Sequence, residues 1–182
     1  IVYDGLGRTA EIYREGDDDT KPSLSYEYSY GEPVSRVLEF SRSEQNGELD
    51  RQSAKCIDGL GRITQLRNKE GSSSVFVDGY SAFDRRGNAV AIYQPYQSST
   101  LDCETTPPSD VRFTTVHYDG LGRTLRSVRP DADLHDGTPS MAGFAYEPLR
   151  TIAFDENDLD ESSPFFSTPL VRDYDGQERL TS

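Results

Sequence analysis

The sequence predicts an all-β protein, an irregular repeat array of antiparallel β-hairpins, and three observations support this. The pentapeptide Asp-Gly-Leu-Gly-Arg occurs three times, at residues 4–8, 58–62 and 119–123, and such self-similarity indicates a repeat architecture. Runs of β-prone residues flank the copies. The composition, with 11 Tyr, 8 Phe, one Met and no Trp, favours strands with one wet face over a helical core.

Two degraded copies extend the set, at residues 83–88 and 174–179, and the common frame is aromatic-Asp-x-x-Gly-Arg. Ile57 takes the aromatic position of the second copy, Asn88 replaces Arg in the third copy, and Glu178 replaces Gly in the last. The residues assigned to the motif, all in structural roles, are Tyr3, Asp4, Gly7, Arg8, Asp58, Gly61, Arg62, Phe83, Asp84, Gly87, Tyr118, Asp119, Gly122, Arg123, Tyr174 and Asp175.

The motif has the composition of a tight hairpin connection. Asp accepts hydrogen bonds from the backbone two residues on, and Gly adopts positive φ without a Cβ penalty. We therefore expect residues 4–7 to reverse the chain and the strand to resume at Arg8. The aromatic residue before the turn and the Arg after it would then lie close enough to stack. The alternative, a ligand or catalytic site at Asp and Arg, needs a nucleophile, base or metal cluster that recurs with the motif, and the sequence has none.

Hydrophobic periodicity predicts the strands between the turns. Tyr26, Tyr28 and Tyr30 alternate with polar residues and predict a strand with one tyrosine-bearing face. The expected strands span residues 8–13, 24–30, 34–40, 63–68, 75–83, 89–93, 111–118, 123–129, 150–154 and 170–174.

Polar segments between these strands are expected to be loops. Residues 17–22 are predicted to form a solvated loop, and Asn46-Gly47 to form a turn. The Ser-, Thr- and Pro-rich segment 95–110 is expected to be an exposed connection. Residues 131–148 show little periodicity and are expected to be irregular.

The frame Tyr-Asp-x-x-Gly-Arg resembles the YD repeat, also called the Rhs repeat, of bacterial polymorphic toxins, insecticidal toxin complexes and teneurin ectodomains. The segments Tyr26 to Pro33, Cys56 to Lys69 and Gln94 to Tyr96 look most like the Rhs region of toxin-complex B components and related virulence proteins. The resemblance implies that residues 1–182 are a YD-repeat region and a piece of a longer array. It also implies a spiralling β-sheet shell that encloses a toxic C-terminal polypeptide, with that polypeptide and other toxin-complex subunits as partners.

An alternative interpretation is a binding module for carbohydrate or a cell-surface protein, as in teneurin-like ectodomains. Five tyrosines would supply its stacking faces, namely Tyr26, Tyr28, Tyr30, Tyr93 and Tyr96. The sequence has no Asn-x-Ser/Thr sequon and few cysteines, which argues against an animal ectodomain.

Charge and hydropathy exclude two classes of partner. The chain has 19 basic and 32 acidic residues, a net charge of −13, and its arginines are dispersed, which argues against nucleic-acid binding. No apolar run approaches the roughly 20 residues of a membrane span, and no signal-peptide pattern is visible. The toxin resemblance implies a secreted or cell-surface protein.

The sequence gives no catalytic, cofactor or metal signature, so we expect a non-enzymatic chain. Cys56 and Cys103 are expected to be idle thiols, with a single disulfide as the alternative. His117 and His135 have no zinc-like spacing. Two acidic clusters, at residues 131–136 and 155–158, suit solvated loops better than calcium sites because their ligand spacing is wrong.

Overall fold

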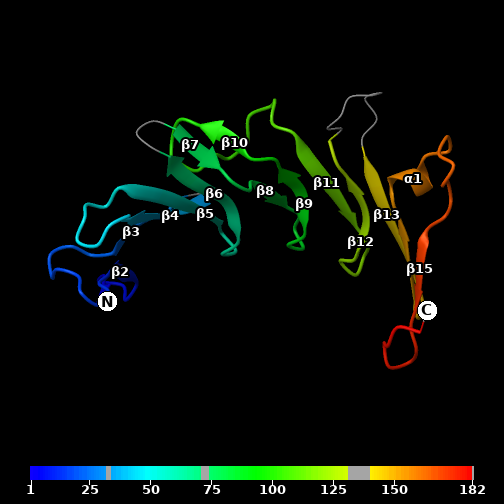
Figure 1. The fold of residues 1–182 in the computed structure, drawn as a ribbon, viewed down its shortest axis with the longest axis horizontal. Coiled ribbons are helices and arrows are strands. Elements are labelled where there is room, and N and C mark those ends of the chain that lie inside the picture. Colours follow the sequence, from blue (N-terminus) through cyan, green and yellow to red (C-terminus); the bar gives the residue numbers. More distant parts are fainter. Residues whose placement is uncertain (32–33, 71–73, 131–139, 182) are drawn as a thin grey trace. The chain divides into compact units, whose positions relative to one another are not determined.

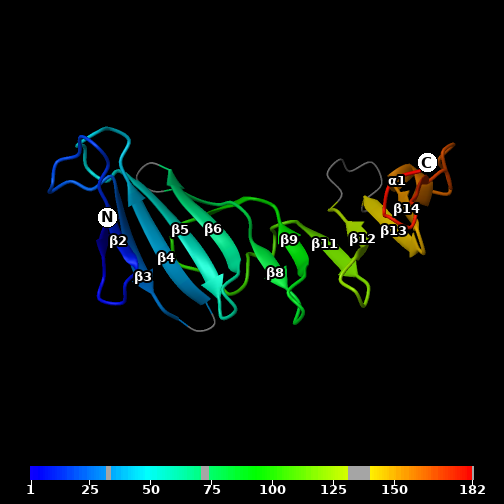
Figure 2. The ribbon, with the colours of Figure 1, turned by 90° about the horizontal axis from the view of Figure 1, so that it is seen from below.

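The chain forms two compact units in a computed structural model that describes residues 1–31, 34–70, 74–130 and 140–181. The first unit comprises residues 1–81 and 93–111, and the second comprises residues 82–92 and 112–182. Each unit is built on one β-sheet (Figures 1 and 2). The predicted all-β fold is confirmed.

The sheet of the first unit has eight strands in the order β1-β2-β3-β4-β5-β6-β7-β10, and its described pairings are antiparallel. Neighbouring strands in the sheet are mostly neighbours in sequence, as in a meander of hairpins (Figure 2). The strands are β1 (Val2–Tyr3), β2 (Thr9–Ile12), β3 (Leu24–Ser29), β4 (Val34–Ser41), β5 (Arg51–Asp58), β6 (Ile63–Glu70), β7 (Ser74–Val77) and β10 (Tyr96–Ser98).

The sheet of the second unit has seven strands in the order β15-β14-β13-β12-β11-β9-β8. The strands are β8 (Ser81–Phe83), β9 (Ala89–Tyr93), β11 (Phe113–Tyr118), β12 (Thr124–Val128), β13 (Met141–Glu147), β14 (Arg150–Phe154) and β15 (Leu170–Asp173). One short helix, α1 (Glu156–Leu159), follows β14 (Figure 1). Two of the three unit boundaries fall within β8 and β9, and the third lies between Val111 and Arg112, just before β11.

The expected strand at residues 75–83 is interrupted by an irregular segment at residues 78–80. Residues up to Val77 form β7 in the first sheet, whereas β8 begins at Ser81 in the second. Gly79 between them has φ +89°, a conformation that side-chain-bearing residues rarely adopt. Asp78-Gly79 is therefore a strand break that the apolar run on either side concealed.

Strand β13 was not predicted, because the segment 131–148 was expected to be irregular throughout. Small residues weaken its β signal. A Cβ at Gly143 would lie at ordinary van der Waals distance from its neighbours, 3.6 Å from the Cβ of Phe154 on β14 and 3.8 Å from a methyl group of Leu159 in α1. The strand is specified by its pairing with β12 and β14 more than by its own propensity.

The acidic segment 155–158 is a helix start, which corrects the prediction of a solvated loop. Asp155 is the N-cap of α1, and its side chain accepts from the amide of Asp158 at 3.1 Å, while Asp158 accepts from the amide of Asp155 at 2.8 Å. This capping box satisfies amides that the helix leaves unpaired. Asp158 also accepts from the amide and hydroxyl of Thr168. The carboxylate oxygens of Asp158 are thus committed to donors within the protein. The other acidic cluster, at residues 131–136, lies outside the described residues.

The core of the first unit lies against one face of β5, β6 and β7. Val77, Tyr80 and Tyr96 form a buried cluster, against which Tyr93 and Val111 pack. The Tyr80 and Tyr93 rings meet edge-to-face at 5.1 Å between centroids, a favourable aromatic geometry. Because Ala54, Cys56, Gln65, Arg67 and Val77 share this face through the register of the three strands, polar and apolar groups are buried together.

The segment 99–110, here called the strap, is an irregular and mostly exposed connection, as predicted, but it lies on this face and contacts it through half-buried residues. The first residues of the predicted connection instead form β10. Arg67 is completely buried, forms an ion pair with Glu104 at 3.0 Å and donates to the carbonyl of Thr100 at 2.9 Å. Gln65 bonds to the backbone of Glu104 through both ends of its amide. Tyr80 donates to the carbonyl of Thr105 at 2.9 Å. The strap therefore supplies hydrogen-bond and ion-pair partners to the side chains that β6 buries.

A disulfide fixes the strap covalently, which corrects the expectation of idle thiols. Cys103 in the strap is bonded to Cys56 in β5, with 5.7 Å between their Cα atoms. The sequence separation of 47 residues closes a long loop, and such a crosslink removes entropy from the unfolded chain. Spacing alone could not predict this pairing, because the strap must first fold back over β5.

Removal of the disulfide should destabilise the first unit strongly. The chain-entropy relation for a loop of this length gives a loss of about 4 kcal/mol in the free energy of unfolding for Cys103→Ser. Urea unfolding of the whole chain, with and without a thiol reductant, measures this loss. Reductant should lower the midpoint of the parent chain and leave that of Cys103→Ser unchanged; an equal response in both would contradict the crosslink.

Candidate functional site

The repeated turn is the one constellation that the sequence singles out, and its geometry is set by an aspartate. In the first copy, Oδ1 of Asp4 accepts from the amides of Leu6 and Arg8, each at 2.9 Å. Oδ2 of Asp4 accepts from the Nε of Arg8 at 2.6 Å and pairs with its Nη2 at 2.5 Å. Two backbone bonds close the loop, from Asp4 to the carbonyl of Arg8 and from Gly7 to the carbonyl of Asp4. The carboxylate thus binds both ends of the turn.

All five copies repeat this arrangement, including the two degraded ones. The motif aspartate accepts from the amides two and four residues later at 2.8–3.0 Å in the other four copies. Arg62, Arg123 and Arg179 each donate from Nε to their aspartate at 2.7 Å. In the third copy, the side-chain amide of Asn88 donates the equivalent hydrogen bond to Asp84 at 3.0 Å. Asn88 therefore substitutes for the hydrogen bond of Arg but not for its charge.

The position before the motif arginine always has positive φ. The values are 75° for Gly7, 80° for Gly61, 93° for Gly87 and 81° for Gly122. Glu178 adopts 60° at the same position of the last copy. The turn therefore forms without glycine there, at the cost of a conformation that is unfavourable for a residue with a Cβ.

The pKa of every motif aspartate is lowered from its usual value. For Asp4 the main cause is the side-chain bond from Arg8, and for Asp119 it is the backbone bond from Arg123. The backbone bond from Asn88 lowers the pKa of Asp84 in the same way, and that from Arg179 lowers the pKa of Asp175. At Asp58, burial acts in the opposite direction but is outweighed by the bonds from Arg62. Donors directed at the carboxylate favour its charged form.

Arg8 and Arg123 each stack on a tyrosine of the strand that pairs with the one leaving the turn, whereas the sequence predicted stacking on the aromatic residue of their own turns. The guanidinium of Arg8 lies 4.2 Å from the ring centroid of Tyr28 and 5.2 Å from that of Tyr30. The guanidinium of Arg123 lies 4.3 Å from the ring centroid of Tyr146 on β13. The contact therefore joins a turn to the following hairpin and adds a cation–π attraction between repeats.

The same tyrosines bond to the backbone just after the motif, and we call this combination the tyrosine clamp. Tyr28 donates its hydroxyl to the carbonyl of Thr9 at 2.8 Å, and Tyr146 donates to the carbonyl of Thr124 at 2.9 Å. Thr9 follows Arg8, and Thr124 follows Arg123. Each clamp thus fixes both the arginine and the first residue of the strand that leaves its turn.

The third copy shows that a motif tyrosine itself can serve in a clamp. Tyr118 opens the fourth copy, and its hydroxyl donates to the carbonyl of Ala89 at 2.9 Å. Ala89 follows Asn88, the last residue of the third copy. Consecutive copies of the motif are therefore connected directly here, through the tyrosine of one and the backbone that follows the other.

The five tyrosines considered as stacking residues do not form one platform. Tyr26 and Tyr28 lie on β3 and are half-buried, and Tyr30 follows that strand and is 71% exposed. Arg8 lies over Tyr28 and Tyr30 and also donates to the hydroxyl of Tyr30. Tyr93 and Tyr96 belong to the core cluster, and Tyr96 donates to Glu104 at 2.7 Å. Burial and this bond raise the pKa of Tyr96.

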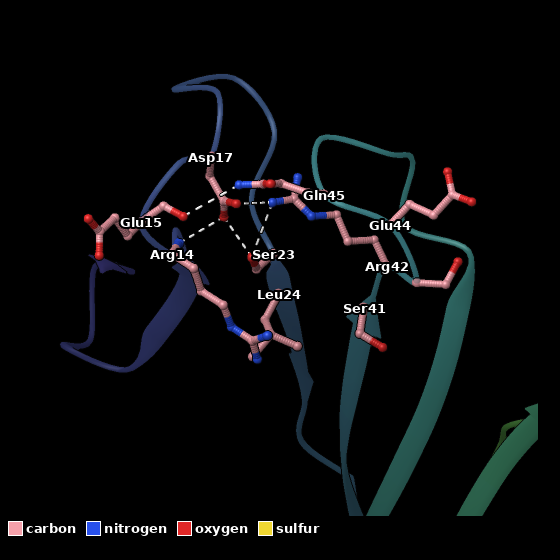
Figure 3. Close-up of a pocket in the computed structure, with 10 residues that line it drawn as sticks. Arg14, Glu15, Asp17, Ser23, Leu24, Ser41, Arg42, Glu44 and Gln45 are labelled. Atoms are coloured by element: carbon pink, nitrogen blue, oxygen red, sulfur yellow. Dashed lines mark hydrogen bonds and ion pairs between the residues drawn. The ribbon is translucent and has the colours of Figure 1, made fainter.

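A pocket at the opposite end of the first sheet from the turns lies beside a buried ion pair that the sequence did not indicate. The pocket has a volume of about 260 Å³. Figure 3 shows the side chain of Arg42 directed at that of Asp17. The two side chains form an ion pair and are only 4% and 3% exposed, respectively. Arg42 also donates to the carbonyl of Lys21 at 2.8 Å, and Asp17 accepts from Ser23 at 2.6 Å. Asp17 was expected in a solvated loop, but it joins the β2–β3 and β4–β5 connections.

Within the residues that the structure describes, no group of His, Cys, Asp and Glu is arranged to hold a metal ion. The same residues include no helix that is long and apolar enough to span a membrane. The motif carboxylates and guanidiniums are directed at each other, and each pair closes a loop of five residues. The arrangement is that of a structural turn, and the chain is an all-β protein of hairpins closed by Asp–Arg turns.

Three solved structures of toxin complexes share this fold. The crystal structure of TcdB2-TccC3-TEV and that of TcdB2-TccC3 without its hypervariable C-terminal region each align with a TM-score of 0.64 at 17% sequence identity. The Tc holotoxin pore of Photorhabdus luminescens, with a mutated TccC3, aligns with a TM-score of 0.65 at 19% identity. Each alignment covers 80% of this chain but only 8% of the other chain.

These structural matches are with proteins of toxin complexes, the group to which the sequence motif pointed. No model of a protein family matches the sequence, and no curated protein sequence matches it significantly. The TM-scores of 0.64–0.65 establish a common fold despite the sequence identity of only 17–19%. The aligned part of this chain spans only about a twelfth of the length of those proteins.

Two glycines of one turn provide a test of its backbone requirement. Gly122 has φ +81°, whereas Gly120 lies outside the positive-φ region and has open space around its Cβ position. Gly122→Ala should lower the free energy of unfolding by about 1–2 kcal/mol, because Ala is strained there. Gly120→Ala, the matched control, should change it by less than about 0.5 kcal/mol. Urea unfolding and amide exchange on β11 and β12 measure both; equal effects would contradict the assigned turn.

Acid should destabilise the chain through the motif aspartates. Their folded pKa values lie below the usual 3.8, so the unfolded state binds protons first as the pH falls. Their stabilisation is fully present above the unfolded pKa and is lost as the pH falls through the folded values. Urea midpoints between about pH 6 and 2 should therefore fall most steeply below about pH 4. Asp119→Asn should show a shallower fall, and a flat profile in the parent chain would contradict the pairing.

Proposed function

We propose that this chain is a non-catalytic structural segment of an Rhs/YD-repeat toxin protein. In this proposal it forms part of a β-sheet shell that encloses a toxic C-terminal polypeptide and helps to deliver it. The observation that carries the proposal is the common fold with the TcdB2-TccC3 structures, combined with five turns of one geometry along the chain. The partners would be the enclosed polypeptide and other toxin-complex subunits, and the protein would be secreted as a virulence factor.

The architecture suits enclosure for a physical reason. An antiparallel sheet that grows by adding hairpins keeps its backbone bonds satisfied between neighbours, and closing such a sheet on itself removes its reactive edges. The local turns need no metal or cofactor to form. A wall of this kind isolates its contents from protease and water without any chemistry of its own.

The acidic balance fits a wall more readily than a nucleic-acid or membrane contact. The net charge of −13 opposes binding to phosphates. The exposed motif leucines Leu6, Leu60 and Leu121, at 74%, 74% and 80% exposure, lie singly at turn tips. Isolated leucines do not provide the basic and aromatic side chains to which a nucleic acid binds.

Protease protection tests the proposal in the longer polypeptide that this segment would belong to. The C-terminal region should resist protease when the segment is intact. It should become cleavable when Gly7, Gly61 and Gly122 are all changed to Val, because a β-branched residue strains the positive φ while keeping strand propensity. The control protein carries Val in place of Gly5, Gly59 and Gly120. These three glycines have open space around their Cβ positions.

Protection in the parent and control proteins, with digestion of the triple variant, supports the shell. Equal digestion of all three proteins would overturn enclosure. Protection that survives in the triple variant, with its turns shown to be disrupted by amide exchange, would place the protecting wall elsewhere and would also reject the proposed role.

A further inference from the structure

Six dipeptides in the described chain place glycine directly after aspartate or asparagine, a pairing that is chemically reactive. The backbone nitrogen of the glycine can attack the side-chain carbonyl carbon of the preceding residue, and glycine hinders this attack least because it has no Cβ. The side chain must first leave its hydrogen-bonding partners, so these partners decide which dipeptides react. The six are Asp4-Gly5, Asn46-Gly47, Asp58-Gly59, Asp78-Gly79, Asp119-Gly120 and Asp175-Gly176.

The four motif aspartates that precede glycine are held through both carboxylate oxygens. Oδ1 of Asp119 accepts from the amides of Leu121 and Arg123 at 2.8 and 2.9 Å, and its Oδ2 accepts from Nε of Arg123 at 2.7 Å. The same three bonds form at Asp4, Asp58 and Asp175. An attack on any of these carboxyl carbons would require the carboxyl group to rotate away from three donors.

Asn46-Gly47 is held in a different way. Oδ1 of Asn46 accepts from the amide of Asp18 at 2.7 Å, and its Nδ2 donates to the carbonyl of Gly16 at 3.4 Å. The attacking nitrogen is also engaged, because Gly47 donates to the carbonyl of Glu44 at 3.1 Å. Both groups that would have to react at this turn are therefore occupied.

Asp78-Gly79 is the exception. Among the residues that the structure describes, neither the carboxylate of Asp78 nor the nitrogen of Gly79 has a hydrogen-bond or ion-pair partner. Both residues are exposed, and Gly79 has open space around its Cβ position. Asp78 is placed by a backbone bond within the first sheet, from its amide to the carbonyl of Leu66 on β6 at 2.8 Å. Its side chain is therefore free at a position that the sheet itself fixes.

We propose that Asp78 is a site of spontaneous isoaspartate formation and that the Asp–Arg turns protect the other Asp-Gly bonds from this reaction. The nitrogen of Gly79 bonds to Cγ of Asp78, and a carboxyl oxygen leaves as water with the amide proton and the carboxyl proton. Water then opens the resulting succinimide ring at either of its C–N bonds. Cleavage at Cγ restores aspartate, whereas cleavage at the main-chain carbonyl carbon leaves a chain that runs through the side chain. The reaction is independent of whether any shell encloses a polypeptide.

Isoaspartate at this position lengthens the main chain by a methylene group beside the core of the first unit. Tyr80, two residues later, is 8% exposed and donates to the carbonyl of Thr105 in the strap at 2.9 Å. The same link connects β7 of the first sheet to β8 of the second. The modification also leaves a free main-chain carboxylate, the group on which an isoaspartyl carboxyl methyltransferase acts.

Peptide mapping of the whole chain, aged at neutral pH for several weeks, tests the proposal. Mass spectrometry with electron-transfer fragmentation distinguishes isoaspartate from aspartate at each site. Because three hydrogen bonds protect each motif aspartate, isoaspartate should form about a hundredfold faster at Asp78 than at Asp4, Asp58, Asp119 or Asp175. In urea, where the turns are lost, the five sites should react at similar rates. Equal rates in the folded chain, or no isoaspartate at Asp78, would overturn the proposal.

Removal of one protecting arginine tests the turn directly. Arg123→Ala deletes the bond from Nε and leaves the two backbone bonds, so isoaspartate at Asp119 should form about tenfold faster, with no change at Asp4. Arg126→Ala removes an exposed arginine of the same strand that is not bonded to Asp119, and it should change neither rate. An unchanged rate at Asp119 in Arg123→Ala would overturn the protection. If circular dichroism shows that Arg123→Ala unfolds, Arg123→Lys takes its place, since Lys keeps the charge but lacks the Nε donor.

Discussion

The carboxylate at the head of each turn is the interaction on which the rest of the fold depends. One oxygen collects two backbone amides and the other holds the arginine, so a single side chain fixes the reversal of the chain and the start of the next strand. Without that carboxylate, the two amides would need water or other partners, and the register of the hairpin would be set only by its flanking strands. Because the carboxylate immobilises the arginine, the flat face of the guanidinium is held in a fixed position against the ring of the neighbouring tyrosine.

The geometry within each turn and the contact between neighbouring hairpins therefore both follow from one residue pair. Within a turn, the bonds between Asp4 and Arg8 are local, and across turns the ring of Tyr28 extends them to the next hairpin. The second copy differs, since the strand after Arg62 and β6 is β7, whose sequence Ser-Val-Phe-Val has no tyrosine. There the first unit uses a buried polar core and a disulfide instead, which stabilise the same sheet through the strap.

Sequence reasoning predicted what is encoded locally and missed what depends on distant contacts. The all-β fold and most strands followed from alternation, as in Tyr26 to Tyr30, because a half-buried strand repeats every second residue. The turn residues followed from backbone requirements, such as the positive φ of Gly7. By contrast, Met141–Glu147 is a strand because it pairs with β12 and β14, and Arg67 is buried where Glu104 of the strap reaches it. Neither pattern is visible until the chain has folded back.

The turns can be irregularly spaced because each one is closed by its own residues. Successive motif aspartates are 54, 26, 35 and 56 residues apart, yet the bonds that close each turn stay within five residues. Such a unit can be duplicated, deleted or separated by an insertion without disturbing any other. Evolution can then lengthen a sheet by copying hairpins and can add a strap or a helix between them. The third and last copies keep the loop geometry with Asn88 and Glu178 at motif positions, so the turn accepts substitutions at the positions of Arg and Gly.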